Sequence, residues 1–232
     1  MALSDVAIKR ALADGEVVIH PYSEADLGSA SYDVRLGRYY FEARQRRDPF
    51  PADPWFYNIY SERSIREVWG QYKTASPALA WKSTFPDQDW TNIRDDDELI
   101  VLEPHANLLC HTYEFIGARR LSTTMMKARS SIGRSLVNVC QCAGMGDVGY
   151  FNRWTMEVYN RSDWHIPLVV HRRIAQIVFL ETGPTEKVYV SKYQGTDDLS
   201  TLEREWHPDA MLARMHEDRD VRDQFIAAEY NA

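Results

Sequence analysis

The stretch KARSSIGRSLVNVCQCAGMGDVGYFNRWTMEVYN, residues 127–160, decides how the rest of this chain is interpreted. Its first half places Arg129 and Arg134 around two serines and a glycine. Guanidinium forks, hydroxyl donors and a backbone that can approach closely suit a polyphosphate. Its second half places two carboxylates, Asp147 and Glu157, in a segment with the pattern of paired β-strands. The arginines could therefore hold an anion, while the carboxylates could hold a sugar and transfer protons.

Short segments with strand patterns follow one another closely on both sides of this stretch, and turn residues separate several of them. Many short strands at such intervals are typical of an all-β sandwich or barrel. Gly37 is expected to end the second of these strands. The predicted strands cover residues 17–19, 32–36, 99–102, 108–112, 136–139, 154–159, 166–170, 175–180 and 188–190.

Helical patterns lie near the two ends of the chain. Ser4 is a plausible N-cap and Gly15 a stop signal, so residues 4–14 are predicted to form a helix. After Gly195, apolar residues recur at roughly helical spacing among charges up to residue 226. Pro208 is expected to separate two helices in this part of the chain.

The composition of the chain limits the classes of protein to which it can belong. With 232 residues, 44% of them hydrophobic, the chain can bury one sizeable core and carry a small appendage. No apolar run approaches the roughly 18 residues of a membrane helix, and no secretion signal begins the chain. The odd set of three cysteines, with Cys140 and Cys142 close together, suits reduced thiols in the cytoplasm. A net charge of −7 argues against a nucleic-acid binder, although a local cation cluster could still bind a small anion.

Several motifs, in order over residues 3–196, resemble those of the dCTP deaminase branch of the dUTPase superfamily. Each motif alone is weak, but their shared order is specific. The resemblance implies a mainly β, dUTPase-like barrel or sandwich with a short N-terminal helix. The motifs are Asp14-Gly15-Glu16-Val17-Val18-Ile19-His20-Pro21, Ser31-Tyr32-Asp33-Val34-Arg35-Leu36-Gly37, the Arg-Ser-Ser-x-x-Arg, Asp-x-Gly-aromatic and Thr-x-Glu series within residues 129–157, and Lys192-Tyr193-Gln194-Gly195.

Comparison with the family pattern predicts a deaminase domain of residues 1–196 with an aromatic-rich insertion at about residues 44–95. Residues 197–232 are predicted to form a helical extension. Five prolines break regular structure in the insertion, and a helix is predicted only over 64–72. The simpler interpretation of the insertion is a loop layer pinned by four tryptophans. The alternative is an additional wall of the base pocket, or a subunit contact.

Hydrolytic deamination of cytosine requires a water molecule activated beside C4. One route uses zinc in an H-x-E…P-C-x-x-C arrangement. This chain has no C-x-x-C, and none of its seven histidines is followed two positions later by Glu. The other route uses a carboxylate alone. The resemblance implies that Glu157 is this general base and proton shuttle, at a position where dUTPases proper usually have an apolar residue. The alternative is a strand glutamate that faces solvent.

The resemblance also implies the remaining roles. Asp147 would accept the sugar 3′-hydroxyl, with Tyr150 against the ring. Mg²⁺ would arrive on the triphosphate, held by phosphate oxygens and water, so no protein ligand is assigned. The other interpretations are surface ion pairs for the arginines, a turn residue for Asp147 and a polar edge strand near residue 192. The predicted catalytic residues are Glu157, Ser130, Arg134 and Ala143; the predicted substrate-binding residues are Arg129, Ser131, Asp147, Tyr150, Tyr189, Lys192, Tyr193 and Gln194.

The resemblance further implies a homotrimer that binds dCTP or dUTP between subunits and deaminates dCTP without zinc. Ala143-Gly144-Met145 resembles deaminases that continue to dUMP and pyrophosphate. Leu136 and Gly146 depart from the family pattern. The alternatives are a plain dUTP diphosphatase, or a nucleotide sensor without catalysis. The sequence leaves open whether a modified cytosine is the substrate and whether dTTP regulates the protein.

Overall fold

The computed structural model describes residues 1–44, 56–140, 142–187, 189 and 191–218 of the chain. Its strands are β1 (Val17–His20), β2 (Tyr32–Glu42), β3 (Lys73–Thr74), β4 (Ser76–Pro77), β5 (Glu98–Leu102), β6 (Asn107–Ala118), β7 (Ser122–Ala128), β8 (Val137–Val139), β9 (Met145–Gly146), β10 (Phe151–Asn160), β11 (Ile166–Val169) and β12 (Arg173–Glu181). Its helices are α1 (Asp5–Ala13), α2 (Glu62–Trp69), α3 (Ala78–Thr84), α4 (Ser130–Arg134) and α5 (Leu199–Glu205), with 3₁₀ turns η1 (Glu24–Asp26), η2 (Pro208–Met211) and η3 (Met215–Glu217).

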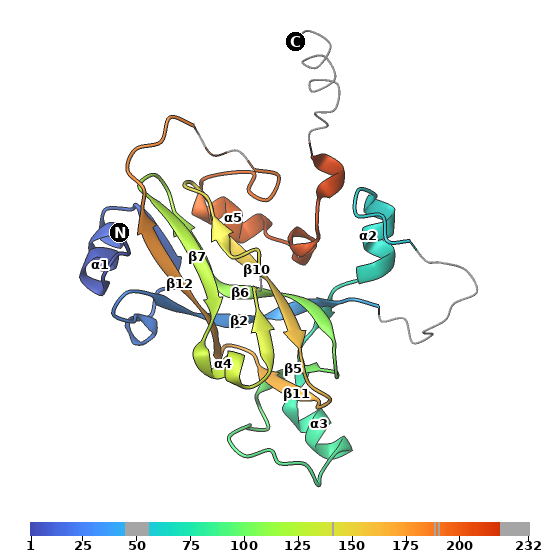
Figure 1. The fold of residues 1–232 in the computed structure, drawn as a ribbon. Helices are drawn as coiled ribbons and strands as arrows, with labels where there is room; N and C mark the ends of the chain where they lie inside the picture. Colours follow the sequence, from blue (N-terminus) through green and yellow to red (C-terminus); the bar gives the residue numbers. More distant parts are fainter. Residues whose placement is uncertain (45–55, 141, 188, 190, 219–232) are drawn as a thin grey trace.

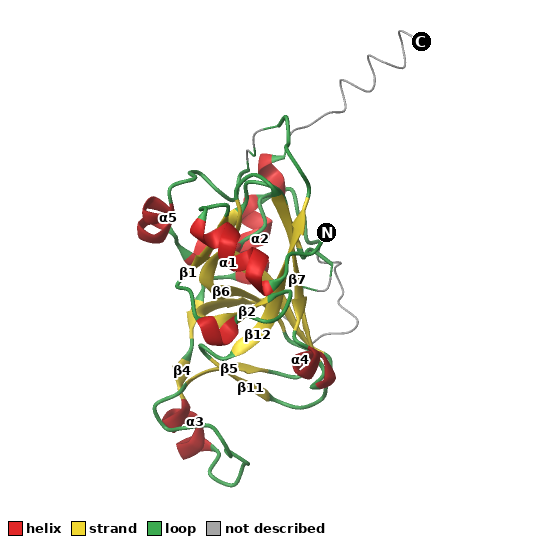
Figure 2. Cartoon of the chain, turned by 90° about the vertical axis from the view of Figure 1, so that its left-hand side faces the viewer, coloured by secondary structure: helices red, strands yellow, loops and turns green. Residues whose placement is uncertain are grey.

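The strands form a curled main sheet with short helices around it, which confirms the prediction of a mainly β fold (Figure 1). The main sheet has nine strands and runs β8-β10-β6-β2-β12-β7-β9, with β1 beside β6 and β3 beside β2. A second sheet of three strands, β11-β5-β4, lies at one end, where α3 projects from it (Figure 2). All of the ladders are antiparallel.

Most predicted elements are present, although several boundaries differ. Ser4 caps α1 as expected, since its hydroxyl oxygen accepts a hydrogen bond from the Ala7 N–H at 3.3 Å. β6 and β10 extend beyond their predicted ends, and β7 was not predicted. Of the strand predicted at residues 188–190, only Tyr189 is described, and it lies outside the strands.

The prediction that Gly37 ends its strand is wrong, because β2 bends there and continues. β2 pairs with β12 over residues 32–35 and with β6 from Leu36 onward, and the ladder to β6 is irregular between Leu36 and Tyr40. The buried ring of His111 fills the space at the bend, 2.0 Å from where a Cβ at position 37 would stand. Its Nε2 accepts a hydrogen bond from the Tyr39 N–H at 3.3 Å. Burial lowers the pKa of His111 to about 3, so the ring is neutral.

The tail after Gly195 differs from the prediction in its second half. α5 is present, but the described residues after Pro208, up to residue 218, form only the single turns η2 and η3 in place of the predicted helix. Leu212 has an extended backbone, and it packs with Met211 into a small cluster on the sheet. Burial of these side chains therefore overrides their helical spacing. Phe225 and Ile226 lie outside the described residues.

The insertion is more regular than a loop layer. Its helix α2 begins after Ser61, whose side chain caps it, and ends at Gly70, which has a φ of 67°. Ile65 of α2 is buried in the same cluster as Met211 and Leu212 of the tail. A second part, around α3, packs Trp81 and Trp90 against β5 and β11. None of the helices in the described ranges has the length and apolar character that spanning a membrane requires.

We expect the substitution Gly37→Ala to destabilise the protein by about 1–3 kcal/mol, because a new methyl group would collide with the buried His111 ring. The denaturant midpoint of unfolding measures this loss. Gly195→Ala is the matched control, since a Cβ there meets nothing within 4 Å. Equal midpoints for the two variants would contradict the role assigned to the bend.

Candidate active site

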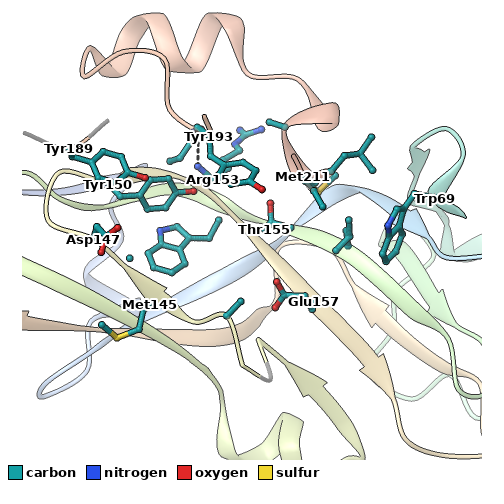
Figure 3. A pocket seen from close by; sticks show the side chains of 18 of the residues that line it. Trp69, Met145, Asp147, Tyr150, Arg153, Thr155, Glu157, Tyr189, Tyr193 and Met211 are labelled. Atoms are coloured by element: carbon teal, nitrogen blue, oxygen red, sulfur yellow. Dashed lines mark hydrogen bonds between the residues drawn. The ribbon is translucent and has the colours of Figure 1, made fainter. Parts of the chain in front are cut away.

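A cavity of about 430 Å³ lies on the face of β10 that the tail covers (Figure 3). Its walls come from β6, β10, the segment around β9, the insertion and the tail. Among the residues predicted from the sequence, six line this cavity: Ala143, Asp147, Tyr150, Glu157, Tyr189 and Tyr193. The structure thus gathers residues that are far apart in the chain.

Glu157 points into this cavity from the middle of β10 (Figure 3). It stands opposite Leu109 of β6, and the backbone N–H of Cys140 donates to its carbonyl oxygen at 3.1 Å. Its Oε2 atom is enclosed and has no hydrogen-bond partner among the described residues. Burial raises the pKa of the Glu157 carboxyl. An enclosed carboxylate oxygen that no other group engages can accept a proton from a bound molecule.

The other end of the cavity is formed by one carboxylate, Asp147, and two tyrosines, Tyr150 and Tyr189. Figure 3 shows this end at a distance from Glu157. Asp147 is exposed at the turn before β10. The ring of Tyr150 meets that of Tyr189 edge to face, with centroids 5.9 Å apart. Gly149 has a φ of 103°, and a Cβ there would lie 2.4 Å from the Cβ of Tyr189. Glycine is therefore required for these two tyrosines to meet.

In the Lys192-Tyr193-Gln194 segment, Gln194 and Lys192 form contacts with other parts of the same chain. Gln194 accepts a hydrogen bond from the Phe151 N–H at 2.8 Å and donates one to the Gly149 carbonyl at 3.0 Å. Its amide thus braces the turn before β10, beside a second cavity. The ammonium of Lys192 forms an ion pair with Asp218 of the tail. Of these three residues, Tyr193 lines the cavity that contains Glu157.

The Arg-Ser-Ser segment lies outside the cavity, on and before the short helix α4 (Figure 1). Ser130, Ser131 and Arg134 are exposed. Arg129 is half-buried, and its Nε lies 3.1 Å from Oδ2 of Asp33. Asp33 comes from the Ser31–Gly37 motif, so that motif orients an arginine far away in sequence. The cavity of one chain therefore brings together the predicted sugar and base groups without these cations.

Several residues of the cavity wall were not predicted from the sequence. Trp69 of the insertion and Met211 of the tail lie at the Glu157 end (Figure 3). Their position supports the alternative interpretation of the insertion, as part of the pocket wall. Arg153 also lines the cavity from β10. The alternation of β10 was a usable signal, because Arg153, Thr155 and Glu157 share one face of a strand.

The described residues contain no group of three or more His, Cys, Asp or Glu side chains arranged to hold a metal ion. Cys110 and Cys140 are buried, and burial raises the pKa of the Cys140 thiol to about 12. Burial thus keeps both thiols protonated at neutral pH. Cys142 is exposed.

The fold and sequence were compared with known proteins. A family model described as dCTP deaminase-like matches residues 73–182. A "dCTP deaminase, dUMP-forming" from Halobacterium salinarum is 34% identical over 204 residues, covering 85% of this chain and 91% of that protein. A dCTP deaminase from Natronomonas pharaonis is 31% identical over 202 residues, covering 84% of this chain and 90% of that protein.

Among solved structures, the 2′-deoxycytidine 5′-triphosphate deaminase of Agrobacterium tumefaciens has a TM-score of 0.53 at 19% identity. The match covers 78% of this chain and 48% of the other, and it supports the fold alone. The sequence identity to the archaeal proteins extends over most of both chains and includes the region that carries Glu157. On this ground the chain belongs to the dCTP deaminase family of enzymes.

Proposed function

We propose that this enzyme hydrolyses dCTP to dUTP and ammonia without zinc, with Glu157 as general base and proton shuttle. The observation that carries the proposal is the enclosed Glu157 carboxylate, whose Oε2 has no partner among the described residues. Membership of the dCTP deaminase family supports the substrate. A plain dUTP diphosphatase would not need this buried carboxylate.

Glu157 would act on the water that attacks C4 of the base. The carboxylate takes one proton from this water as the new C–O bond forms, and N3 receives that proton. The same side chain then delivers the second proton of the water to the amine, which leaves as ammonia. Burial favours this role because it raises the pKa of the carboxyl and makes the carboxylate a stronger base.

The rest of the cavity would orient the nucleotide. Asp147, at the far end from Glu157, would accept the 3′-hydroxyl of the sugar, and the ring of Tyr150 would pack against the sugar. The backbone at Ala143, which lines the same cavity, would help to position the water. In this arrangement the base would lie beside Glu157 and the sugar beside the two tyrosines.

The cations of the Arg-Ser-Ser segment would reach the phosphates from a second chain, and we propose a homotrimer with shared sites. Ser130, Ser131 and Arg134 are exposed on α4 and lie outside the cavity of their own chain. Arg129 is held at 3.1 Å by Asp33, which would pre-orient its guanidinium for a neighbour's triphosphate. Lys192 would add a cation after it exchanges Asp218 for phosphate. Mg²⁺ would arrive as part of the nucleotide substrate.

The reaction would continue to dUMP and pyrophosphate in the same pocket. This step is supported by the relatives that are named dUMP-forming. The structure gives Gly144 an additional reason to be glycine, because a Cβ there would lie 2.4 Å from the Met126 carbonyl oxygen. The neighbouring Met145 is exposed and lines the cavity. Asp147 could orient the second water near the sugar and the α-phosphate.

Incubation with each deoxynucleoside triphosphate and Mg²⁺, followed by chromatography, tests the reaction. We expect dCTP to yield ammonia, dUMP and pyrophosphate. The nearly isosteric Glu157→Gln should lose roughly 10²–10⁴-fold in turnover and retain binding, because its amide cannot accept the proton. Near-normal deamination by this variant would rule out the mechanism. Accumulation of dUTP without pyrophosphate would rule out the second step alone.

The acid limb of the pH–rate profile tests the environment of Glu157. The carboxyl must be ionised to act as a base, so turnover should fall as the pH drops through its raised pKa. Met211→Ser should admit water to the cavity, lower this pKa and move the limb to lower pH. Leu79→Ser, at an exposed position of α3, is the control and should leave the limb in place. A limb that Met211→Ser does not move would show that the tail does not set the pKa of Glu157.

Mixed oligomers test the shared site. Light scattering should show a trimer. Glu157→Gln and Arg129→Ala chains should each be inactive alone, and mixing them under exchange conditions should restore part of the activity, because some sites then combine two intact contributions. Two Glu157→Gln preparations, mixed in the same way, serve as the control. The absence of recovery in folded, exchanging mixtures would argue for sites within single chains.

A further inference from the structure

Arg153 is a half-buried cation of the cavity that the proposed mechanism does not use. It lies on the same face of β10 as Glu157, about 13 Å away at the usual rise of a strand. Its guanidinium lies between two aromatic rings, with the carbon Cζ 4.9 Å from the centroid of Phe115 and 4.9 Å from that of Trp206. Phe115 belongs to β6 and Trp206 to the tail.

No carboxylate balances this charge among the residues that the structure describes. Two glutamates, Glu203 and Glu114, act on the guanidinium through their charge, but each is paired with another residue. Glu203 lies 2.9 Å from His20, and Glu114 accepts a hydrogen bond from Arg35 at 2.6 Å. The Nε of Arg153 is enclosed and has no hydrogen-bond partner in the described part of the chain. Burial lowers the pKa of its guanidinium, which is nevertheless always charged in proteins.

A partly desolvated charge without a counter-ion is costly, so a site of this kind favours an anionic ligand. The aromatic rings cover the guanidinium from two sides, and its N–H donors lie in its plane. This leaves the fork geometry that binds the oxygens of phosphate. A neutral carbonyl group of the base could accept a hydrogen bond, but it would not balance the charge.

We propose that Arg153 binds a phosphate group of the nucleotide, within the same chain that supplies Glu157. The proposal deepens the proposed function and rests on it for the identity of the nucleotide. Tyr193 of the Lys192–Gly195 motif lines the same cavity, which places this motif and Arg153 at one site. Because Trp206 covers the guanidinium, the phosphate would bind beside a contact that joins the tail to the sheet.

Calorimetric titration of Arg153→Met and Arg153→Lys with dCTP, deoxycytidine and inorganic tripolyphosphate tests this role. Arg153→Met should weaken dCTP and tripolyphosphate by about 10- to 100-fold, as expected for the loss of charged hydrogen bonds, and should leave deoxycytidine within about twofold. Arg153→Lys keeps the charge and should lose less. Arg204→Met, at an exposed position of α5, is the control and should not change any of the three affinities.

Equal losses for dCTP and deoxycytidine, with tripolyphosphate unchanged, would overturn the proposal and leave Arg153 as a structural support for Trp206. If the Met variant does not fold, the Lys variant still decides, because a structural role predicts no dependence on phosphate. Failure of the wild-type protein to deaminate dCTP would refute the proposed function. A phosphate-dependent loss in the binding experiment would nevertheless stand.

Discussion

The pairing of β10 with β6 places Glu157 directly opposite Leu109, and the chemistry of the site depends on this pair. An antiparallel ladder brings paired side chains close together on one face of the sheet. The carboxylate therefore has an apolar neighbour fixed by backbone hydrogen bonds, and its Oε2 is shielded from water. A shift of the register by one residue would turn Glu157 into the main core, where a carboxylate would have no ligand to act on.

The apolar cluster around Leu109 explains why the insertion and the tail matter to this site. Leu109 packs there with Phe41, Ile65, Met211 and Leu212, which come from β2, α2 and the tail. The same contacts that hold the insertion and the tail on the sheet also form a wall of the cavity. Stability and the electrostatic environment of Glu157 thus depend on one set of apolar contacts. The ion pair of Arg66 with Asp209, at 3.5 Å, adds a contact between these segments at the surface.

Charged side chains away from bulk solvent fall into two groups in this fold: some are paired with each other, and others face the cavity. Arg35 and Glu114 form a closed pair that links β2 and β6, with the Arg35 N–H and Nε both donating to the carboxylate. Such a pair satisfies itself and leaves little for a ligand. Glu157 and Arg153 instead each keep an enclosed polar atom that finds no partner among the residues the structure describes, and both line the cavity. The contrast separates groups that stabilise the fold from groups that are available for binding.

The sequence by itself determined the β-rich class and the helix after Ser4. It also indicated the candidate site residues that lie between positions 143 and 157. Strand alternation and local motifs depend on neighbouring positions, which is why the sequence alone was sufficient for these features. It could not determine the bend at Gly37, since the reason is the ring of His111 on another strand. Nor could it place Trp69 and Met211 beside Glu157. Their positions follow from packing between segments far apart in the chain, and apolar burial there overrode the helical spacing of the tail. Tertiary structure also separated Arg134 from the cavity of its own chain, because α4 lies beyond the end of β7.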